Sequence, residues 1–169
     1  KAFAPMARRI IVAGSLRRRK QMVGDVEILY IPKIEVRPDP QDMFGTIEVN
    51  LVDEEIGELE KDGVLERRKN AIGSEMFGPK NKLMRHKATG MQVDLFSTTD
   101  ERWFMSLVIR TGPKDFNLAL IKAAGLKGLN LHAYGVYTRM RSGDEVIPRD
   151  EQEVLSLAGM KWIEPWERK

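Results

Sequence analysis

The chain has 169 residues, of which 42% are hydrophobic and 31% charged, and its cations exceed its acids by three. This composition is typical of a globular protein with one core or two small lobes, and no apolar run approaches the roughly 20 residues that span a bilayer. The chain has no cysteine and only two distant histidines, which excludes disulfides, thiolate metal sites and a histidine-rich zinc site. Any bound metal would therefore need carboxylate oxygens, which favour magnesium, manganese or calcium.

Charge is clustered along the sequence. Residues 8–20 contain six cations and no acid, whereas residues 53–62 contain six acids and one lysine. This separation is typical of a surface that meets a polyanion, although a charge run is also compatible with an ordinary solvated face.

The first half of the chain predicts a sheet. The run RIIVAG predicts a buried strand, Ser15 is a candidate cap for a short cationic helix over LRRRKQM, and VGDVEILYIP predicts a strand that ends at Pro32. RPDPQD predicts a loop, and Asn50 predicts the start of a helix that runs to Lys61. VLERRK, SEMFGPKNKLMRHKATG and MQVDLFST then predict strands with a basic connection.

After Thr99 the pattern changes. DERWFMSLVI and DFNLALIKAAG predict helices, LNLHAYGVYT and DEVIPR predict a hairpin, and Asp150 predicts the cap of a last helix over DEQEVLSLAGM. We expect an α+β protein with a sheet-centred lobe over residues 1–99 and a smaller mixed lobe over residues 100–169.

Three carboxylates predict a divalent-metal site. Asp25 and Glu27 are two residues apart on a predicted strand, so their side chains leave the same face and repel unless a cation lies between them. Asp94 stands in the middle of another apolar strand, where an unpaired charge costs several kcal/mol. If these strands lie side by side, the three acids suit one or two magnesium ions.

The cations predict an anion site beside these acids. Gly14 and Ser15 form a turn from a strand into a helix, where backbone amides and a hydroxyl face one place, and Arg18 lies one turn further on. Gly24, just before Asp25, permits a close approach of the backbone. Such a cradle beside a carboxylate metal site suits a magnesium-bound nucleoside triphosphate. Each feature alone has a plainer explanation: a simple turn, a solvated helix face or an exposed edge strand.

The combined pattern resembles a known family. GSLRRRKQMVGDVE followed by VDLF is similar to the nucleotidyltransferase signature of the family X DNA polymerases, the polymerase beta group. RTGPKDFNLAL, LNLHAYGVY and EVLSLAGMKWIEPWER resemble the thumb of that family, in the same order. The resemblance runs from about residue 10 to residue 168. It implies the family's minimal form, with a nucleotidyltransferase palm over residues 1–99 (a mixed or antiparallel sheet with flanking helices) and a small α/β thumb over residues 100–169.

The resemblance also implies roles for single residues. Asp25, Glu27 and Asp94 stand where the family has its three catalytic, metal-binding aspartates, and the nucleotide-binding positions are matched by Gly14, Ser15, Arg18, Gly24, Thr111, Gly112 and Asn117. Three positions depart from the family pattern: Glu27 is longer than an aspartate, Arg110 replaces an aromatic residue, and Gln92 replaces an arginine near the primer terminus.

One backbone detail follows from the same resemblance. The family's Thr-Gly turn contains a cis peptide bond after the glycine, which costs about 3 kcal/mol for an ordinary residue and under about 1 kcal/mol before proline. Because Pro113 follows Gly112 here, we predict a cis Gly112–Pro113 bond.

Other cations are weaker candidates for a nucleic-acid contact, and a solvated hairpin explains them equally well. They are Lys80, Lys82, Arg85 and Lys87 with the neighbouring Gln92, and, in the thumb, Lys127 and Arg139.

We therefore expect a metal-dependent nucleotidyltransferase that uses two Mg²⁺ ions, with Mn²⁺ as a substitute, and that adds nucleotides to a primer 3′-hydroxyl as a DNA-directed DNA polymerase on primed or gapped duplex, in repair or replication. The expected partners are DNA and a nucleoside triphosphate, and we expect an intracellular monomer without membrane association, in the cytoplasm or nucleoid, with a viral or phage origin left open. Two alternatives stay open: a template-independent or RNA-directed nucleotidyltransferase, and a nucleic-acid-binding module weakened catalytically by Glu27.

Overall fold

The protein has an α+β fold, described here by a computed structural model for residues 2–132 and 135–169. Its backbone contacts divide it into two compact units: unit 1 holds residues up to 11 with residues 30–97, and unit 2 holds residues 12–29 with residues 98–169. The return to unit 2 at residue 98 lies close to the expected lobe boundary, but residues 12–29, which the sequence assigns to the first lobe, make their contacts in unit 2. No helix in the described part of the chain is long and apolar enough to cross a membrane.

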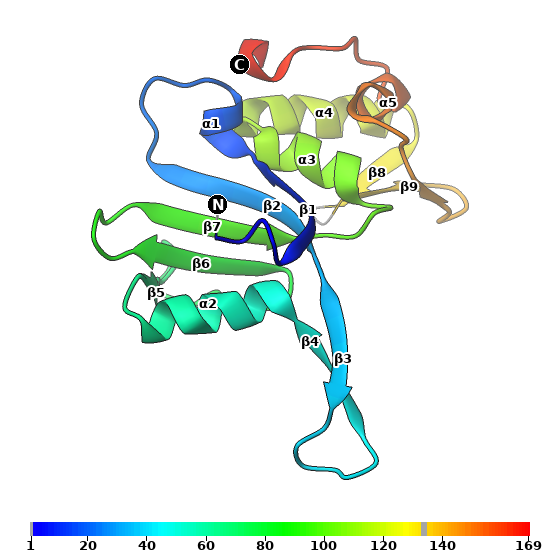
Figure 1. Ribbon diagram of the computed structural model, residues 1–169. Coiled ribbons are helices and arrows are strands. Elements are labelled where there is room, and N and C mark those ends of the chain that lie inside the picture. Colours follow the sequence, from blue (N-terminus) through cyan, green and yellow to red (C-terminus); the bar gives the residue numbers. More distant parts are fainter. Residues whose placement is uncertain (1, 133–134) are drawn as a thin grey trace. The chain divides into compact units, whose positions relative to one another are not determined.

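The largest sheet has the strand order β1-β2-β7-β6-β5 (Figure 1), and β5, β6 and β7 belong wholly to unit 1. The strands are β1 (Ala7–Val12), β2 (Asp25–Pro32), β5 (Leu65–Arg67), β6 (Asn81–His86) and β7 (Gln92–Ser97). β6 is antiparallel to both β5 and β7, with Leu83 opposite Asp94. The predicted strands are thus confirmed, and β2 is the point at which the chain passes from unit 2 into unit 1.

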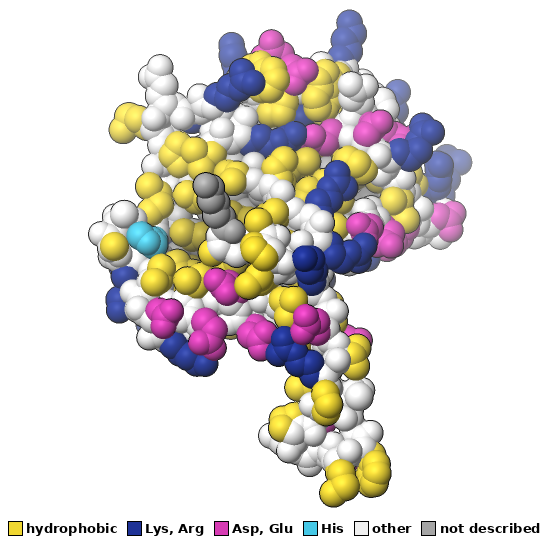
Figure 2. Space-filling view, viewed as in Figure 1, with side chains coloured by type: hydrophobic (Ala, Val, Ile, Leu, Met, Phe, Trp, Pro, Cys, Tyr) yellow, Lys and Arg dark blue, Asp and Glu magenta, His cyan; other side chains and the backbone are white. Residues whose placement is uncertain are grey.

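Helix α2 (Leu51–Lys61) belongs to unit 1 and begins directly after Asn50, as the sequence predicts. The Asn50 side chain accepts hydrogen bonds from the amides of Val52 and Asp53, at 3.0 and 3.3 Å. Val52 and Ile56, one helical turn apart, are fully buried, so the helix packs through one apolar stripe. Acidic side chains occupy the exposed side of this helix (Figure 2).

The structure contains a hairpin that the sequence does not predict. β3 (Ile34–Pro38) and β4 (Thr46–Asn50) form a separate two-stranded ribbon, with Ile34 opposite Asn50 and Pro38 opposite Thr46. The predicted loop RPDPQD overlaps the end of β3 at residues 37 and 38 and otherwise lies in the turn between the two strands. The ribbon projects from the rest of unit 1 (Figure 1), and Met43 and Phe44 at its tip are 90% and 93% exposed (Figure 2). Two prolines in the segment hid its strand pattern.

Unit 2 has one apolar core between helices and a small sheet. Its elements are α1 (Gly14–Arg17), α3 (Trp103–Thr111), α4 (Lys114–Leu126), β8 (Leu129–His132), β9 (Val136–Arg139), β10 (Glu145–Val146), α5 (Glu151–Leu157) and a 3₁₀ helix, η1 (Pro165–Glu167). Buried residues of α3, α4 and α5 pack against Leu129 of β8 and Tyr137 of β9. Asp150 caps α5 as predicted, since its Oδ1 accepts from the Glu153 amide at 2.7 Å. Ala133 and Tyr134 of the predicted hairpin lie outside the described residues.

Helix α1 is shorter than predicted, and Ser15 does not cap it. The helix covers only residues 14–17, and its N-cap residue is Ala13, without a side-chain cap bond. Arg19 has a φ of +56°, a left-handed conformation that ends the helix. The Arg19 guanidinium lies 3.9 Å from the centre of the Trp166 ring, a cation–π contact within unit 2. The cationic run is therefore mostly loop.

A partly buried ion-pair network joins α1 to the end of the chain. The Arg17 guanidinium donates to both carboxylate oxygens of Glu151, at 2.8 and 2.6 Å, and to the Thr111 hydroxyl at 2.8 Å. Arg168, 3% exposed, lies 3.6 Å from the same Glu151 carboxylate. Burial lowers the pKa of the Arg168 guanidinium, and the Glu151 carboxylate opposes this shift. Glu151 therefore compensates two cations inside unit 2.

We predict that Glu151→Gln lowers the free energy of unfolding by about 3 kcal/mol, because it leaves two partly or fully buried guanidinium groups without their carboxylate. Glu153→Gln on the same helix removes the exposed partner of Arg149 and should cost under about 1 kcal/mol. Urea unfolding of the two variants measures the difference. Equal losses would show that the network adds nothing beyond a surface pair.

Candidate nucleotide-binding site

The turn from β1 into α1 places Gly14 and Ser15 at the start of α1, and Arg18 directly follows this helix; all three are in unit 2. Gly14 is buried, with a φ of +59°, a conformation that an L-side chain rarely adopts. The amide of Ala13 donates to the carbonyl of Glu27 at 2.8 Å, so the turn is hydrogen-bonded to the strand that carries the second predicted acid. The sequence predicts that the turn at Gly14 lies beside the strand of Asp25 and Glu27, and the structure has this arrangement.

The Glu27 side chain lies directly above Gly14. A Cβ atom built on Gly14 would stand 1.9 Å from Oε2 of Glu27, far inside any van der Waals contact. The longer side chain thus extends back over the turn and occupies the space that the missing side chain leaves. Gly24 differs, because a Cβ there would meet no atom within 4 Å and its backbone has no left-handed φ. The protein itself therefore requires glycine at position 14 but not at position 24.

Several polar atoms of the turn lack partners. The Ser15 hydroxyl oxygen and Nε of Arg18 are buried without a hydrogen bond among the described residues, which is costly for a polar group. Nη1 of Arg18 donates to the carbonyl oxygen of Thr111, and this bond fixes the guanidinium. A hydroxyl and a guanidinium that keep unused donors fit an anionic ligand such as a triphosphate.

Thr111, Gly112 and Asn117 border the same place. Thr111 is fully buried, and its hydroxyl accepts from Arg17. The Gly112–Pro113 peptide bond is cis, as predicted. Nδ2 of Asn117 donates to the carbonyl of Ile109 at 2.8 Å, while its Oδ1 is buried without a partner and so stays available as an acceptor. The residues implied for the sugar and base therefore lie close to Arg18.

These residues surround a hollow of about 400 Å³ in unit 2. Its charged lining consists of Arg18, Arg110 and Lys114 with one acid, Glu27, and the rest is Ile109, Gly112, Pro113, Asn117 and Leu118. The excess of cations favours an anionic ligand. The sequence analysis did not include Lys114. The helix dipole disfavours a cation at the first residue of α4, and this unusual position is a signal that could have identified it.

Asp25 and Glu27 are both half-buried on β2. Asp94 of β7 belongs to unit 1, is 9% exposed and forms an ion pair with Arg68, which directly follows β5 in the same unit. Sequence reasoning missed Arg68, because nothing in RRKN signals a partner for an acid 26 residues later. The negative charge of Asp94, which is unfavourable in an apolar strand, is thus compensated by Arg68 within unit 1.

No group of three or more acidic or histidine side chains among the described residues is arranged to hold a metal ion. Asp25 and Glu27 lie in unit 2 and Asp94 in unit 1. Carboxylate oxygens of Asp25 and Glu27 are a donor set that suits Mg²⁺, and their joint use with Asp94 stays a prediction.

The weaker nucleic-acid candidates on β6 and β7 separate into two kinds. Lys82 is 2% exposed, its ammonium donates to the carbonyl of Gly78 and pairs with Asp53 at 2.8 Å, so it does not present its charge at the surface. Four others are exposed: Lys80, Arg85, Lys87 and Gln92. A nucleic-acid contact of this region stays a prediction for these four.

Comparison with known proteins finds a matching family model and a similar solved structure. Residues 106–169 match the family model described as DNA polymerase beta thumb. A crystal structure of polymerase beta from Leishmania infantum, described as a ternary P/T complex, is similar over 95% of this chain and 67% of that one, with a TM-score of 0.69 and 22% identity. No curated protein matches the chain.

The fold is thus that of a polymerase beta-like protein, and the matched thumb extends to the last residue.

We predict that Gly14→Ala destabilises the protein by at least about 1–2 kcal/mol, the cost of a left-handed residue with a Cβ, because it also collides with Glu27. Gly24→Ala is the matched control and should change stability by less than about 1 kcal/mol. Thermal unfolding of both variants measures these stability changes. A Gly14→Ala variant as stable as the wild type would contradict the contact between Glu27 and the turn.

Proposed function

We propose that the protein is a metal-dependent nucleotidyltransferase that extends a primer 3′-hydroxyl, as a DNA-directed DNA polymerase on primed or gapped duplex. One observation carries the proposal: Arg18, Asn117 and Glu27 line the same hollow in unit 2, with an excess of cations around it. The Ser15 hydroxyl, three residues before Arg18, is buried without a partner. The thumb match and the polymerase beta-like fold support the same reaction class.

In this reaction a bond forms between the primer 3′-oxygen and the α-phosphorus, and the bond to pyrophosphate breaks. The Ser15 hydroxyl donates to an oxygen of the triphosphate, and the Arg18 guanidinium, fixed by the Thr111 carbonyl, balances the charge on the leaving side. Oδ1 of Asn117 remains free to accept a hydrogen bond from the nucleotide. These residues bind and orient the nucleotide for in-line attack.

Asp25, Glu27 and Asp94 would hold the divalent ions. When bound, such ions would lower the pKa of the primer 3′-hydroxyl and neutralise part of the triphosphate charge. Asp94 also accepts the proton from the 3′-hydroxyl in this proposal, which requires its carboxylate to leave Arg68 or to be shared with it.

Primer extension on a duplex with a one-nucleotide gap tests the proposal, with deoxynucleotides and ribonucleotides compared. We expect magnesium-dependent insertion by the wild type, and a loss of at least about a hundredfold in Asp94→Asn, because the variant removes a ligand and the proton acceptor. Asp62→Asn, an exposed residue at the end of α2, is the control and should keep wild-type activity.

Three outcomes contradict the proposal in different ways. Activity of Asp94→Asn equal to that of Asp62→Asn rejects the catalytic role. Extension of single-stranded primers without template favours a terminal transferase. Absence of any incorporation, with duplex binding retained, favours a binding module.

The unusual Glu27 gives a separate prediction. In Glu27→Asp the carboxylate retreats from Gly14 by one methylene, so we expect the magnesium concentration for half-maximal insertion to change severalfold while duplex affinity stays the same. Steady-state rates across a magnesium titration measure this. An inactive wild type with an active variant would instead show that Glu27 has weakened catalysis.

A further inference from the structure

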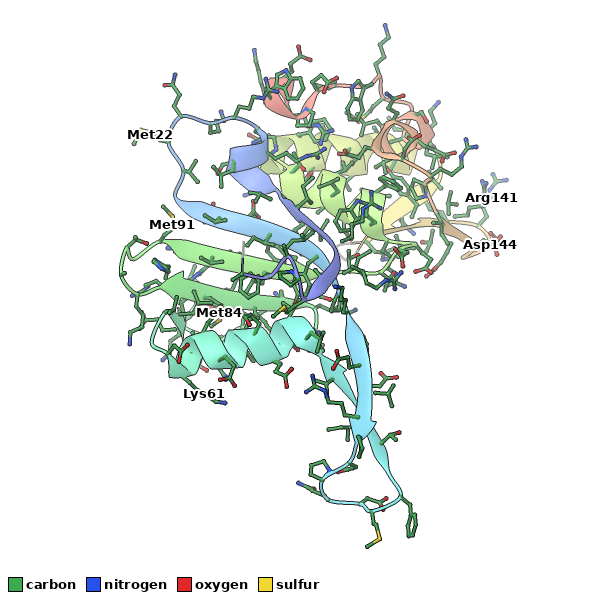
Figure 3. All side chains as sticks on the ribbon, viewed as in Figure 1. Met22, Lys61, Met84, Met91, Arg141 and Asp144 are labelled. Atoms are coloured by element: carbon green, nitrogen blue, oxygen red, sulfur yellow. The ribbon has the colours of Figure 1, made fainter. Side chains whose placement is uncertain are left out.

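A second cationic hollow lies in unit 2, away from the nucleotide site. It has a volume of about 370 Å³ and is lined by Lys127, Gly128, Arg139, Arg141 and Ser142. Three of these five residues are cations, and none is an acid. Arg141 lies on the turn between β9 and β10, at the same tip as Asp144 (Figure 3).

Backbone hydrogen bonds hold the two sides of this hollow together. The amide of Met140 donates to the carbonyl of Gly128 at 2.8 Å, which joins the turn after α4 to the end of β9. The Arg139 amide donates to the Asp144 carbonyl at 2.9 Å, and the Gly143 amide to the Arg139 carbonyl at 2.8 Å. The three cations are therefore carried by short, hydrogen-bonded turns at defined places.

The Lys127 side chain is also positioned. A Cβ atom built on Gly159 would lie 2.6 Å from Cε of Lys127 and 3.5 Å from its Nζ. The lysine stem thus crosses the backbone of Gly159, just after α5, in space that any larger residue would fill. Lys127 is exposed, and its stem passes close to the backbone of unit 2.

These cations have no acidic partners. In the part of the chain that the structure describes, Lys127, Arg139 and Arg141 form no ion pair, whereas other exposed arginines such as Arg37, Arg67 and Arg149 each contact a glutamate. The nearby Asp144 carboxylate instead accepts a hydrogen bond from the Ser142 hydroxyl. Three gathered positive charges repel one another unless an anion lies among them.

We propose that this hollow binds phosphate groups of a nucleic-acid backbone and thereby holds the duplex on the thumb. This inference rests on the proposed function, which makes DNA the substrate. Exposed lysine and arginine side chains bind a repeated phosphate through counterion release, and such contacts fix the position of the duplex without reading its sequence. The site is distinct from the hollow at Arg18, with which it shares no residue.

The test is the salt dependence of duplex binding, measured by fluorescence anisotropy without nucleotide. Arg139→Gln/Arg141→Gln should lower the slope of log affinity against log salt by about 2 and weaken binding on the order of tenfold at 0.1 M salt. Lys122→Gln/Lys161→Gln removes the same charge from two exposed residues outside the hollow and should have a smaller effect. Inorganic phosphate is titrated as a competitor, and millimolar amounts should not displace the duplex.

Failure of this inference can be told apart from failure of the proposed function. Equal slopes in the two double variants, with gap filling intact, overturn the hollow as a backbone site and leave the polymerase proposal standing. A hollow-dependent duplex affinity without any incorporation overturns the polymerase proposal and supports the hollow. Displacement of the duplex by millimolar phosphate, or no duplex binding by the wild type, overturns the backbone assignment.

Discussion

The organisation of unit 2 depends on the two-pronged contact of Arg17 with Glu151. This pair joins the four-residue helix α1, too short to be stable alone, to α5, which lies more than a hundred residues later in the sequence. The same guanidinium reaches Thr111 at the end of α3, and Arg168 approaches the same carboxylate. Because α1 begins with Gly14 and Ser15, the proposed nucleotide cradle belongs to unit 2, and its geometry depends on a partly buried ion pair.

The cradle itself shows how a departure from the expected residue can be accommodated. Glu27 reaches across the left-handed Gly14, so the longer side chain occupies space that the glycine leaves open. The partnerless Ser15 hydroxyl and Asn117 amide oxygen, together with the cations Arg18, Arg110 and Lys114, make the neighbouring hollow suited to an anion that also has hydrogen-bonding groups. A nucleotide combines both properties.

Much of this could be predicted from the sequence, because the decisive signals are local. The strand that carries Asp25 and Glu27 and the caps at Asn50 and Asp150 follow from a few adjacent residues. The cis bond before Pro113 follows from the resemblance to the family's turn together with the proline. The misses involve distant partners or backbone geometry. Arg68 compensates Asp94, Glu151 compensates Arg17, and Arg19 ends α1 by turning left-handed against Trp166, none of which leaves a pattern in the neighbouring residues. The β3–β4 ribbon was missed because prolines masked its alternation.

The buried Lys82 has a consequence for surface chemistry. Its ammonium lies 5.5 Å from the centre of the Phe77 ring and contacts Asp53 and the Gly78 carbonyl, so water and reagents scarcely reach it. Lys80, two positions earlier, is exposed. An amine-directed acylating probe would therefore discriminate between two lysines on the same short segment, and loss of that discrimination would report the opening of unit 1 before the rest of the chain unfolds.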